Sequence, residues 1–371
     1  ASMVIGKTFG EALLRRVLGS VAAVDETALG QVLSALIASE FLFEAALYPE
    51  VEYSFKHPLT QEVAARSQLR ERRARVHAAV AQALEEAGGN LDERAAEIAQ
   101  HWAEAEEPSR AAHWHRRAAE WAGLSDPREG LRHWRRVREL APGVEDESER
   151  TELALHACHE ILSLGWRMGG SETEAAAVFE DGRALTERLG DRRALALLVG
   201  RYGLIRVSIG GSARDYVRYG EEAALLAQEC GDPALRAAVG TFAALGHFHS
   251  GDGRPALEWG APVLEVVGSD NVLGKEIVGY SPRVAMMFNR AHASRRRGTS
   301  SERRSASRRN RKSARYSPGC STPGPSWHIR AGHPSLFWSM PVVALRLRSS
   351  STTRRPGCAR ALPSGLRIGS K

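Results

Sequence analysis

The segment ERLGDRRALALL, residues 187–198, contains the break that decides how the middle of this chain folds. An Ala/Leu/Glu-rich helical stripe ends before Gly190, and Asp191 begins the next one. The same break recurs in QECGDPAL (228–235) and, with one inserted serine, in VVGSD (266–270). The successive aspartates of these breaks lie 41 and 38 residues apart, and a Gly-rich turn divides each interval. This pattern predicts a repeating unit of two helices with a period of about 40 residues.

Helical stripes at three- and four-residue spacing fill residues 90–292, and the clearest repeats are 150–191, 192–232 and 233–270. A helix pair cannot bury its apolar face alone, so consecutive pairs must stack into an α-solenoid with a concave surface. We expect a protein or peptide ligand on that surface. The candidates for contacting it lie on the first helix of a pair: Arg201, Tyr202, Arg206, His247 and His249.

Residues 1–89 carry a mixed pattern in which helices flank a pair of strands. Two helical stripes occupy Lys7 to Ala38. Phe41 to Phe43 and Val51 to Phe55 then read as two short strands around a Pro-containing turn. A helical pattern resumes at Pro58 and continues to Leu84. This order predicts a winged helix, and a three-helix unit with an incidental hairpin is the alternative.

The last 79 residues, 293–371, differ sharply in composition from the rest of the chain. They contain 18 lysines and arginines and a single acid, Glu302, whereas residues 1–292 carry 33 basic and 43 acidic residues. The overall charge of +7 therefore combines an acidic body with a very basic tail. The tail has no helical or strand period, so we expect it to be disordered. It is either a basic arm for nucleic acid or the product of a frameshift in a GC-rich gene, and its Arg/Ser-rich composition favours the frameshift.

Several other classes of protein are excluded by simple inspection. No apolar run approaches the roughly 18 residues that a membrane span needs. The first residues, ASMVIGKTFG, lack the basic region and long apolar stretch of a signal peptide. Four widely spaced cysteines form neither a disulfide framework nor a zinc site. We therefore expect a cytoplasmic protein and, because the chain lacks a conventional start, a fragment that begins inside a domain.

The candidate catalytic and metal-binding residues do not have the spacing along the chain that such sites require. Gly6-Lys7-Thr8 matches the end of a phosphate-binding loop, but that motif needs a glycine where Ala1 stands. Thr8 is better interpreted as a helix N-cap, with Lys7 solvated. The histidines and tryptophans lie in helical stripes and are interpreted mainly as structural. The sequence therefore predicts neither catalytic residues nor a metal site in this chain.

One basic cluster stands out in the acidic body. On a winged helix it could contact DNA phosphates, which leaves a DNA-binding transcription regulator with a basic tail as the alternative function. Flanking acids dilute its field, so a solvated helix face or an intramolecular contact is favoured. The cluster consists of Arg66, Arg70, Arg72, Arg73 and Arg75.

Three segments together resemble a known protein family. They are VIGKTFGEALLRRVL (4–18), the stretch from ALGQVL to TQEVA (28–64), and ERRARVHAAVAQALEE (71–86). They resemble the region that follows the nucleotide-binding module in bacterial signalling ATPases of the STAND type, as found in class III adenylate/guanylate cyclase-like proteins. FLFEAALYPEVEYSFKHPLTQEVA (41–64) is the most specific part, and the resemblance covers roughly residues 1–290.

The resemblance implies a multidomain switch. A cyclase or other output domain and an ATPase domain that binds ATP or ADP would precede this chain, and tetratricopeptide-like repeats would sense a partner. In this family a winged-helix histidine contacts the phosphates of ADP, and His57 stands at the matching position. A strand-to-helix junction beside Lys56 favours an anion, although a structural histidine is the alternative. The chain itself is expected to hold no cofactor and to act as a regulatory, protein-interaction segment.

Overall fold

The computed structural model describes residues 2–21, 25–48, 50–66, 68–123 and 125–293. The predicted disordered and frameshifted tail, residues 293–371, lies outside this part except for Ala293, which is helical. The described part is mostly helical, with one small antiparallel sheet near the N-terminus. No helix within these ranges is long and apolar enough to cross a membrane.

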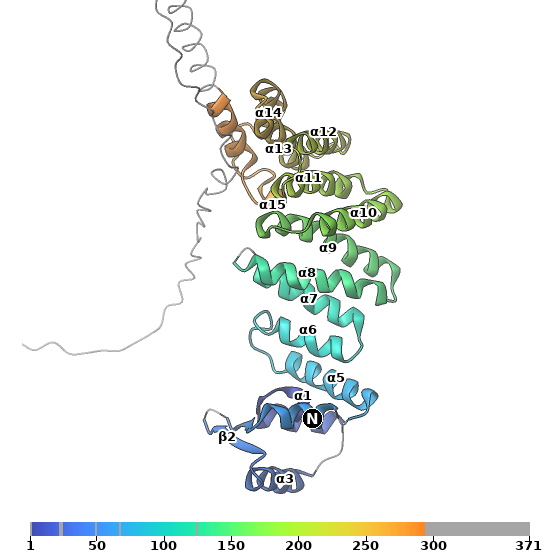
Figure 1. Ribbon diagram of the computed structural model, residues 1–371, viewed down its shortest axis with the longest axis vertical. Helices are drawn as coiled ribbons and strands as arrows, with labels where there is room; N and C mark the ends of the chain where they lie inside the picture. Colours follow the sequence, from blue (N-terminus) through green and yellow to red (C-terminus); the bar gives the residue numbers. More distant parts are fainter. Residues whose placement is uncertain (1, 22–24, 49, 67, 124, 294–371) are drawn as a thin grey trace, which may run out of the picture. The chain divides into compact units, whose positions relative to one another are not determined.

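The N-terminal part places short helices around a three-stranded sheet (Figure 1). Its helices are α1 (Ser2–Ile5), α2 (Glu11–Val21), α3 (Glu26–Ala38) and α4 (Pro58–Arg66), and its strands are β1 (Thr8–Gly10), β2 (Leu42–Ala46) and β3 (Glu52–Phe55). Both outer strands pair antiparallel with β3, in the order β1-β3-β2. The two strands that the sequence pattern predicts are present, and a third strand joins them.

Strand β1 stands where the sequence pattern places the start of a helix. Thr8 and Phe9 pair with Ser54 and Tyr53 of β3, and the Thr8 hydroxyl donates a hydrogen bond to Ser54 Oγ at 3.2 Å. Helix α2 begins only at Glu11, so the interpretation of Thr8 as a helix cap was wrong. A three-residue strand is too short to show a period of two, and pairing with β3 decides its conformation.

The helix predicted from Pro58 to Leu84 is divided in two. A break separates α4 from α5 (Arg70–Glu86). The two halves of the predicted apolar stripe also differ in burial. Leu59 and Val63 of α4 are 71% and 67% exposed. The corresponding residues of α5 are buried in the N-terminal core: Val76, Val80 and Leu84.

The helices from α5 onward stack along the chain (Figure 1). After α5 come α6 (Ala95–Glu104), α7 (Pro108–Ala122), α8 (Pro127–Leu140), a 3-10 turn (Ala141–Gly143), α9 (Glu147–Met168), α10 (Glu172–Leu189), α11 (Arg192–Ser208), α12 (Ala213–Glu229), α13 (Pro233–Ser250) and α14 (Gly253–Val267). Each helix packs on the next, and the first helices of successive pairs, α9, α11 and α13, also contact one another in series. This is the packing of an α-solenoid.

The recurrent Gly-Asp break ends one helix and begins the next. Gly190 closes α10 in the left-handed conformation, with φ at 66°, which a residue with a side chain adopts only at a cost. Asp191 then caps α11, because its carboxylate accepts a hydrogen bond from the Ala194 N–H at 2.9 Å. Asp232 caps α13 in the same way. The repeat signal in the sequence is therefore a pair of helix caps.

Beyond α14 the chain turns back and contacts α11 and α13, the first helices of the last two pairs. Residues 271–281, here called the return segment, contain the short helix α15 (Lys275–Val278), and residues 282–293 are helical. The sequence pattern predicts a helix that is already under way at Val278. The structure instead interrupts it at Gly279, where φ is 78°. Helix α15 packs against α13, and Val278 joins the main hydrophobic core.

Candidate functional site

Arg201 lies on the side of α11 that faces α9 and the return segment. Its guanidinium donates hydrogen bonds to Glu160 Oε1 of α9 at 3.2 Å and to the carbonyl oxygen of Ile277 at 3.3 Å. The side chain is only 15% exposed. Arg201 therefore holds two helices and the return segment together, and a ligand would have to compete with the chain itself for this guanidinium.

The return segment is fastened to α13 at two further points. At Gly274, φ is 77° and an added Cβ would lie 2.8 Å from the carbonyl oxygen of Ala234. The hydroxyls of Tyr280 and Thr241 lie 2.7 Å apart, and burial raises the pKa of Tyr280 to about 12. The part of the predicted ligand surface around Arg201 is therefore occupied by the protein's own residues.

Tyr202 and Arg206 point to a different side of α11. The ring of Tyr202 stacks on Phe179 of α10, with centroids 4.0 Å apart, and meets Tyr219 of α12 edge-on. Tyr202 is 6% exposed. Arg206 forms ion pairs with carboxylates at the starts of α10 and α12. Both side chains thus join α11 to the second helices of two pairs, which leaves little of either for a partner.

His247 and His249 also contact a second helix. His247 Nε2 lies 2.8 Å from Glu221 Oε1 of α12, and its buried Nδ1 has no hydrogen-bond partner among the described residues. The ring of His249 lies 6.0 Å from that of Tyr216, also on α12, and burial lowers the pKa of His249. Four of the five predicted residues therefore contact α10 or α12, whereas Arg201 faces α9. The structure does not gather the five into one surface.

His57 is exposed at the junction between β3 and α4. Beside it, Lys56 forms an ion pair with Glu40, with 2.6 Å between Nζ and Oε2. That pair reduces the positive charge that Lys56 adds next to the histidine. On α4, the exposed side chains of Leu59 and Val63 follow directly in sequence. His57 therefore lies at the edge of an exposed apolar stripe.

Two arginines of the basic cluster are engaged within the chain. Arg66 pairs with Glu62 at 2.6 Å, and Arg70 pairs with Glu106, which follows α6. These are intramolecular contacts of the kind that the flanking acids lead one to expect. They reduce the charge that this helix face offers to a phosphate backbone.

Glu85 joins three helices at the start of the repeat stack, and the sequence analysis did not single it out. Its Oε1 accepts the indole N–H of Trp102 on α6 at 2.5 Å and that of Trp114 on α7 at 2.7 Å. The guanidinium of Arg110 lies 4.4 Å from the ring centroid of Trp102. In the sequence, only Trp102 and Trp114 pointed to this cluster. They were interpreted as packing residues, and nothing in the sequence indicates that they share a carboxylate.

Histidines form two pairs between adjacent helices. The Nδ1 atoms of His115 on α7 and His133 on α8 are 2.8 Å apart, and those of His77 on α5 and His101 on α6 are 3.0 Å apart. Burial lowers the pKa of His115 to about 3 and those of His77 and His101 to about 4. Each pair therefore consists of neutral rings at neutral pH, one donating and one accepting. The described residues contain no group of three or more His, Cys, Asp or Glu placed to hold a metal.

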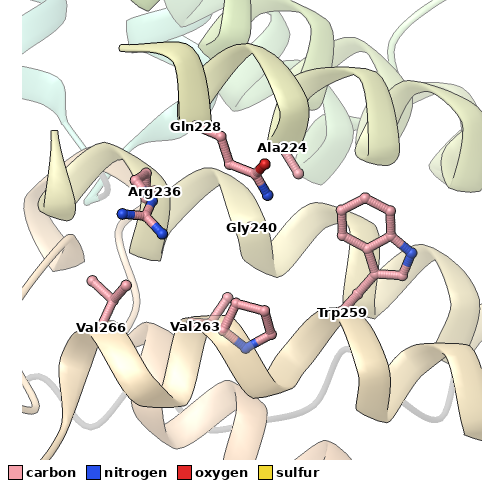
Figure 2. A pocket seen from close by; sticks show the side chains of 8 residues that line it. Ala224, Gln228, Arg236, Gly240, Trp259, Val263 and Val266 are labelled. Carbon is pink, nitrogen blue, oxygen red and sulfur yellow. The ribbon is translucent and has the colours of Figure 1, made fainter. Parts of the chain in front are cut away.

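A small pocket lies where α12, α13 and α14 meet (Figure 2). Its polar residues do not stand out in the sequence, because an arginine in an amphipathic helix is most often a solvated surface charge. Only the packing of three helices shows that one guanidinium and one indole ring border the same space. The lining residues are Ala224 and Gln228 of α12, Arg236 and Gly240 of α13, and Trp259, Pro262, Val263 and Val266 of α14.

Comparisons with known proteins add little to this picture. No family model matches the chain, and no curated protein matches it. Among solved structures, a signal transduction ATPase with numerous domains (STAND) from Pyrococcus horikoshii, which carries a tetratricopeptide repeat sensor, is similar over 77% of this chain and 46% of its own. This chain therefore spans less than half of that protein's length. The sequence identity is 12% and the TM-score is 0.36. The likeness is too distant to transfer a function.

Proposed function

We propose that this chain is a non-catalytic regulatory and protein-interaction segment of a nucleotide-dependent signalling ATPase. The parent would be an adenylate/guanylate cyclase-like protein, and tetratricopeptide-like repeats in this chain would bind a protein or peptide. The observation that carries the proposal is the order of the fold: a small module of helices and one sheet, followed directly by stacked helix pairs. That order is the one that the sequence resemblance leads one to expect.

The exposed surface of the N-terminal module supports a contact with another domain. Its helices and three-stranded sheet are compatible with a winged helix. Leu59 and Val63 lie one turn apart on α4 and are 71% and 67% exposed, and grouped exposed apolar side chains mark interaction sites. We place an ATPase domain against α4, where His57 would contact the phosphates of bound ADP or ATP.

The test is a binding measurement between this chain and the ATPase domain encoded upstream in the same gene, with ADP, with ATP and without nucleotide. Binding should depend on the nucleotide. His57→Ala should weaken it only when nucleotide is present, whereas Val63→Ser should weaken it under every condition. Val32→Ser is the matched control, because Val32 on α3 is also exposed, at 55%.

Two results would decide against the proposal. A gene that encodes no upstream ATPase, or an ATPase domain that does not bind this chain, would overturn it. If wild type and His57→Ala bind the nucleotide-loaded partner equally well, the proposed role of His57 is wrong, but the contact with the ATPase domain still stands. Salt-dependent binding of nonspecific DNA by residues 1–292 would instead favour the DNA-binding alternative.

A further inference from the structure

We propose that the pocket between α12, α13 and α14 binds a carboxylate group of a partner protein or peptide through Arg236. The site is built from other residues than the surface around Arg201 and the junction at His57. It rests on the proposal above that the repeats bind a protein or peptide, but not on the ATPase contact, because a carboxylate can bind here whatever the N-terminal module contacts.

The first argument is the state of the guanidinium itself. Arg236 is half-buried, and its side chain forms no ion pair or hydrogen bond with any residue in the described ranges. Two other half-buried arginines of the stack each pair with a carboxylate: Arg135 with Glu174 at 2.5 Å, and Arg201 with Glu160 at 3.2 Å. A charge that is partly removed from water without a counter-charge is unfavourable, and a bound anion relieves that cost.

The second argument is the shape of the space beside Arg236. Figure 2 shows Arg236 and Trp259 at opposite ends of the pocket, with Gln228 between them. The floor is closely packed, since an added Cβ at Gly240 would lie 2.8 Å from Val263 Cγ2. About 30 Å³ of the pocket is open to the centres of water-sized groups. That is room for a small polar group to enter beside the guanidinium.

The third argument is the match between these groups and a carboxylate. The two oxygens of a carboxylate accept two parallel N–H bonds from a guanidinium, which a single-point anion does not. The amide of Gln228 offers a further donor at the rim. The indole ring of Trp259 and the ring of Pro262 form an apolar wall for the aliphatic group that carries the carboxylate. The source is either a C-terminal carboxylate or an Asp or Glu side chain.

The experiment uses the full 371-residue chain labelled with ¹⁵N-tryptophan. The indole resonance of Trp259 is identified by its loss in Trp259→Phe and is followed during titration with three peptides. These are acetyl-Gly-Ala-Leu with a free C-terminus, the same peptide as its C-terminal amide, and acetyl-Gly-Glu-Leu-amide. A saturable shift with the first or the third peptide, and none with the neutral amide, is expected. Which of the two produces it identifies the source of the carboxylate.

Variants separate binding from folding. Arg236→Ala should remove the saturable shift, and Arg236→Lys, which keeps the charge but loses the paired N–H donors, should weaken binding by about tenfold. Gln228→Ala should weaken it less. Arg188→Ala is the matched control, because Arg188 on α10 is exposed and has no side-chain partner in the described part of the chain.

Three outcomes would overturn the proposal: no saturable shift with either carboxylate peptide, an equal shift with the neutral amide, or an affinity in Arg236→Ala and Arg236→Lys that equals that of wild type. If Arg236→Ala fails to fold, as judged by circular dichroism and Tm, Arg236→Lys and Gln228→Ala decide between the same outcomes.

Discussion

At the scale of single residues, one carboxylate joins the first three helices of the stack, α5, α6 and α7. Both indole N–H groups that reach Glu85 end on the same oxygen, at 2.5 and 2.7 Å. Glu85→Gln removes the charge that strengthens both hydrogen bonds and should destabilise the protein by about 1–3 kcal/mol. Urea denaturation measures this loss. Glu86→Gln, at the exposed neighbouring position of α5, should change the free energy of unfolding little, and equal effects of the two variants would contradict the role given to Glu85.

The buried histidine pairs predict how stability depends on pH. The pKa of His115 is about 3 in the folded chain against an ordinary value of 6.5, with burial as the main cause. The unfolded chain therefore binds more protons than the folded chain between these two pH values. The free energy of unfolding is therefore highest above pH 6.5 and decreases as the pH falls towards 3. At pH 5 the neutral ring of His115 costs about 2 kcal/mol relative to the unfolded chain.

Replacing that histidine should flatten the pH dependence. His115→Gln should reduce the loss of unfolding free energy between pH 7.5 and pH 5 by about 2 kcal/mol. Denaturant titrations at the two pH values measure it. His57→Gln, at an exposed histidine, should leave the difference unchanged, and an unaltered pH dependence in His115→Gln would show that other groups govern acid sensitivity.

At the scale of elements, each helix from α8 to α13 begins at a residue whose side chain caps its first turn. Asp191→Ala removes the acceptor for the Ala194 N–H at the start of α11 and should cost about 1 kcal/mol. Asp191→Asn keeps an acceptor oxygen and should retain most of the stability. Thermal unfolding of the two variants beside wild type measures the difference. If both variants lose the same stability, the charge of Asp191 matters and the cap does not.

Close approach between elements depends on glycine at selected positions. An added Cβ at Gly220 of α12 would lie 2.8 Å from backbone atoms of Phe242 and Ala243 on α13, and backbone cannot move aside as a flexible side chain can. Gly220→Ala should therefore destabilise the protein by about 1–3 kcal/mol. Gly30→Ala in α3, with nothing within 4 Å, should instead stabilise it by up to about 1 kcal/mol. Denaturation midpoints compare the pair, and destabilisation by both would contradict the packing argument.

At the scale of the whole described chain, the return segment ties the last helices together. Gly274→Ala adds a Cβ against Ala234 and Ala238 of α13, whereas Gly279→Ala has a similar φ but nothing within 4 Å. Both variants share the cost of a left-handed residue, and only Gly274→Ala also displaces the segment. Amide hydrogen exchange in residues 271–281 should be about tenfold faster in Gly274→Ala than in Gly279→Ala. Equal exchange in the two would show that α13 does not hold the segment.

The helices of the repeat stack could be predicted from sequence because their signals are local. Apolar spacing marks each helix, and breaks such as Gly190-Asp191 supply a helix end and a helix start within two residues. Strand β1 could not be predicted, because three residues carry no period and their conformation comes from pairing with β3. The side of α11 on which Tyr202 lies could not be predicted from the sequence either. An inner helix such as α11 is apolar on more than one side, so its sequence does not show which neighbour each side contacts.

By itself the sequence determined that this protein is built from helix pairs behind a small strand-containing module, and where most of those helices begin and end. Caps, turns and amphipathic stripes act over a few residues and can be recognised in a single chain. Only the tertiary structure decided that the return segment occupies the surface around Arg201, that Glu85 accepts two indole N–H groups, and that Arg236 borders a pocket without a side-chain partner among the described residues. Those facts depend on side chains far apart in the chain, and distance in space sets whether a charge is paired.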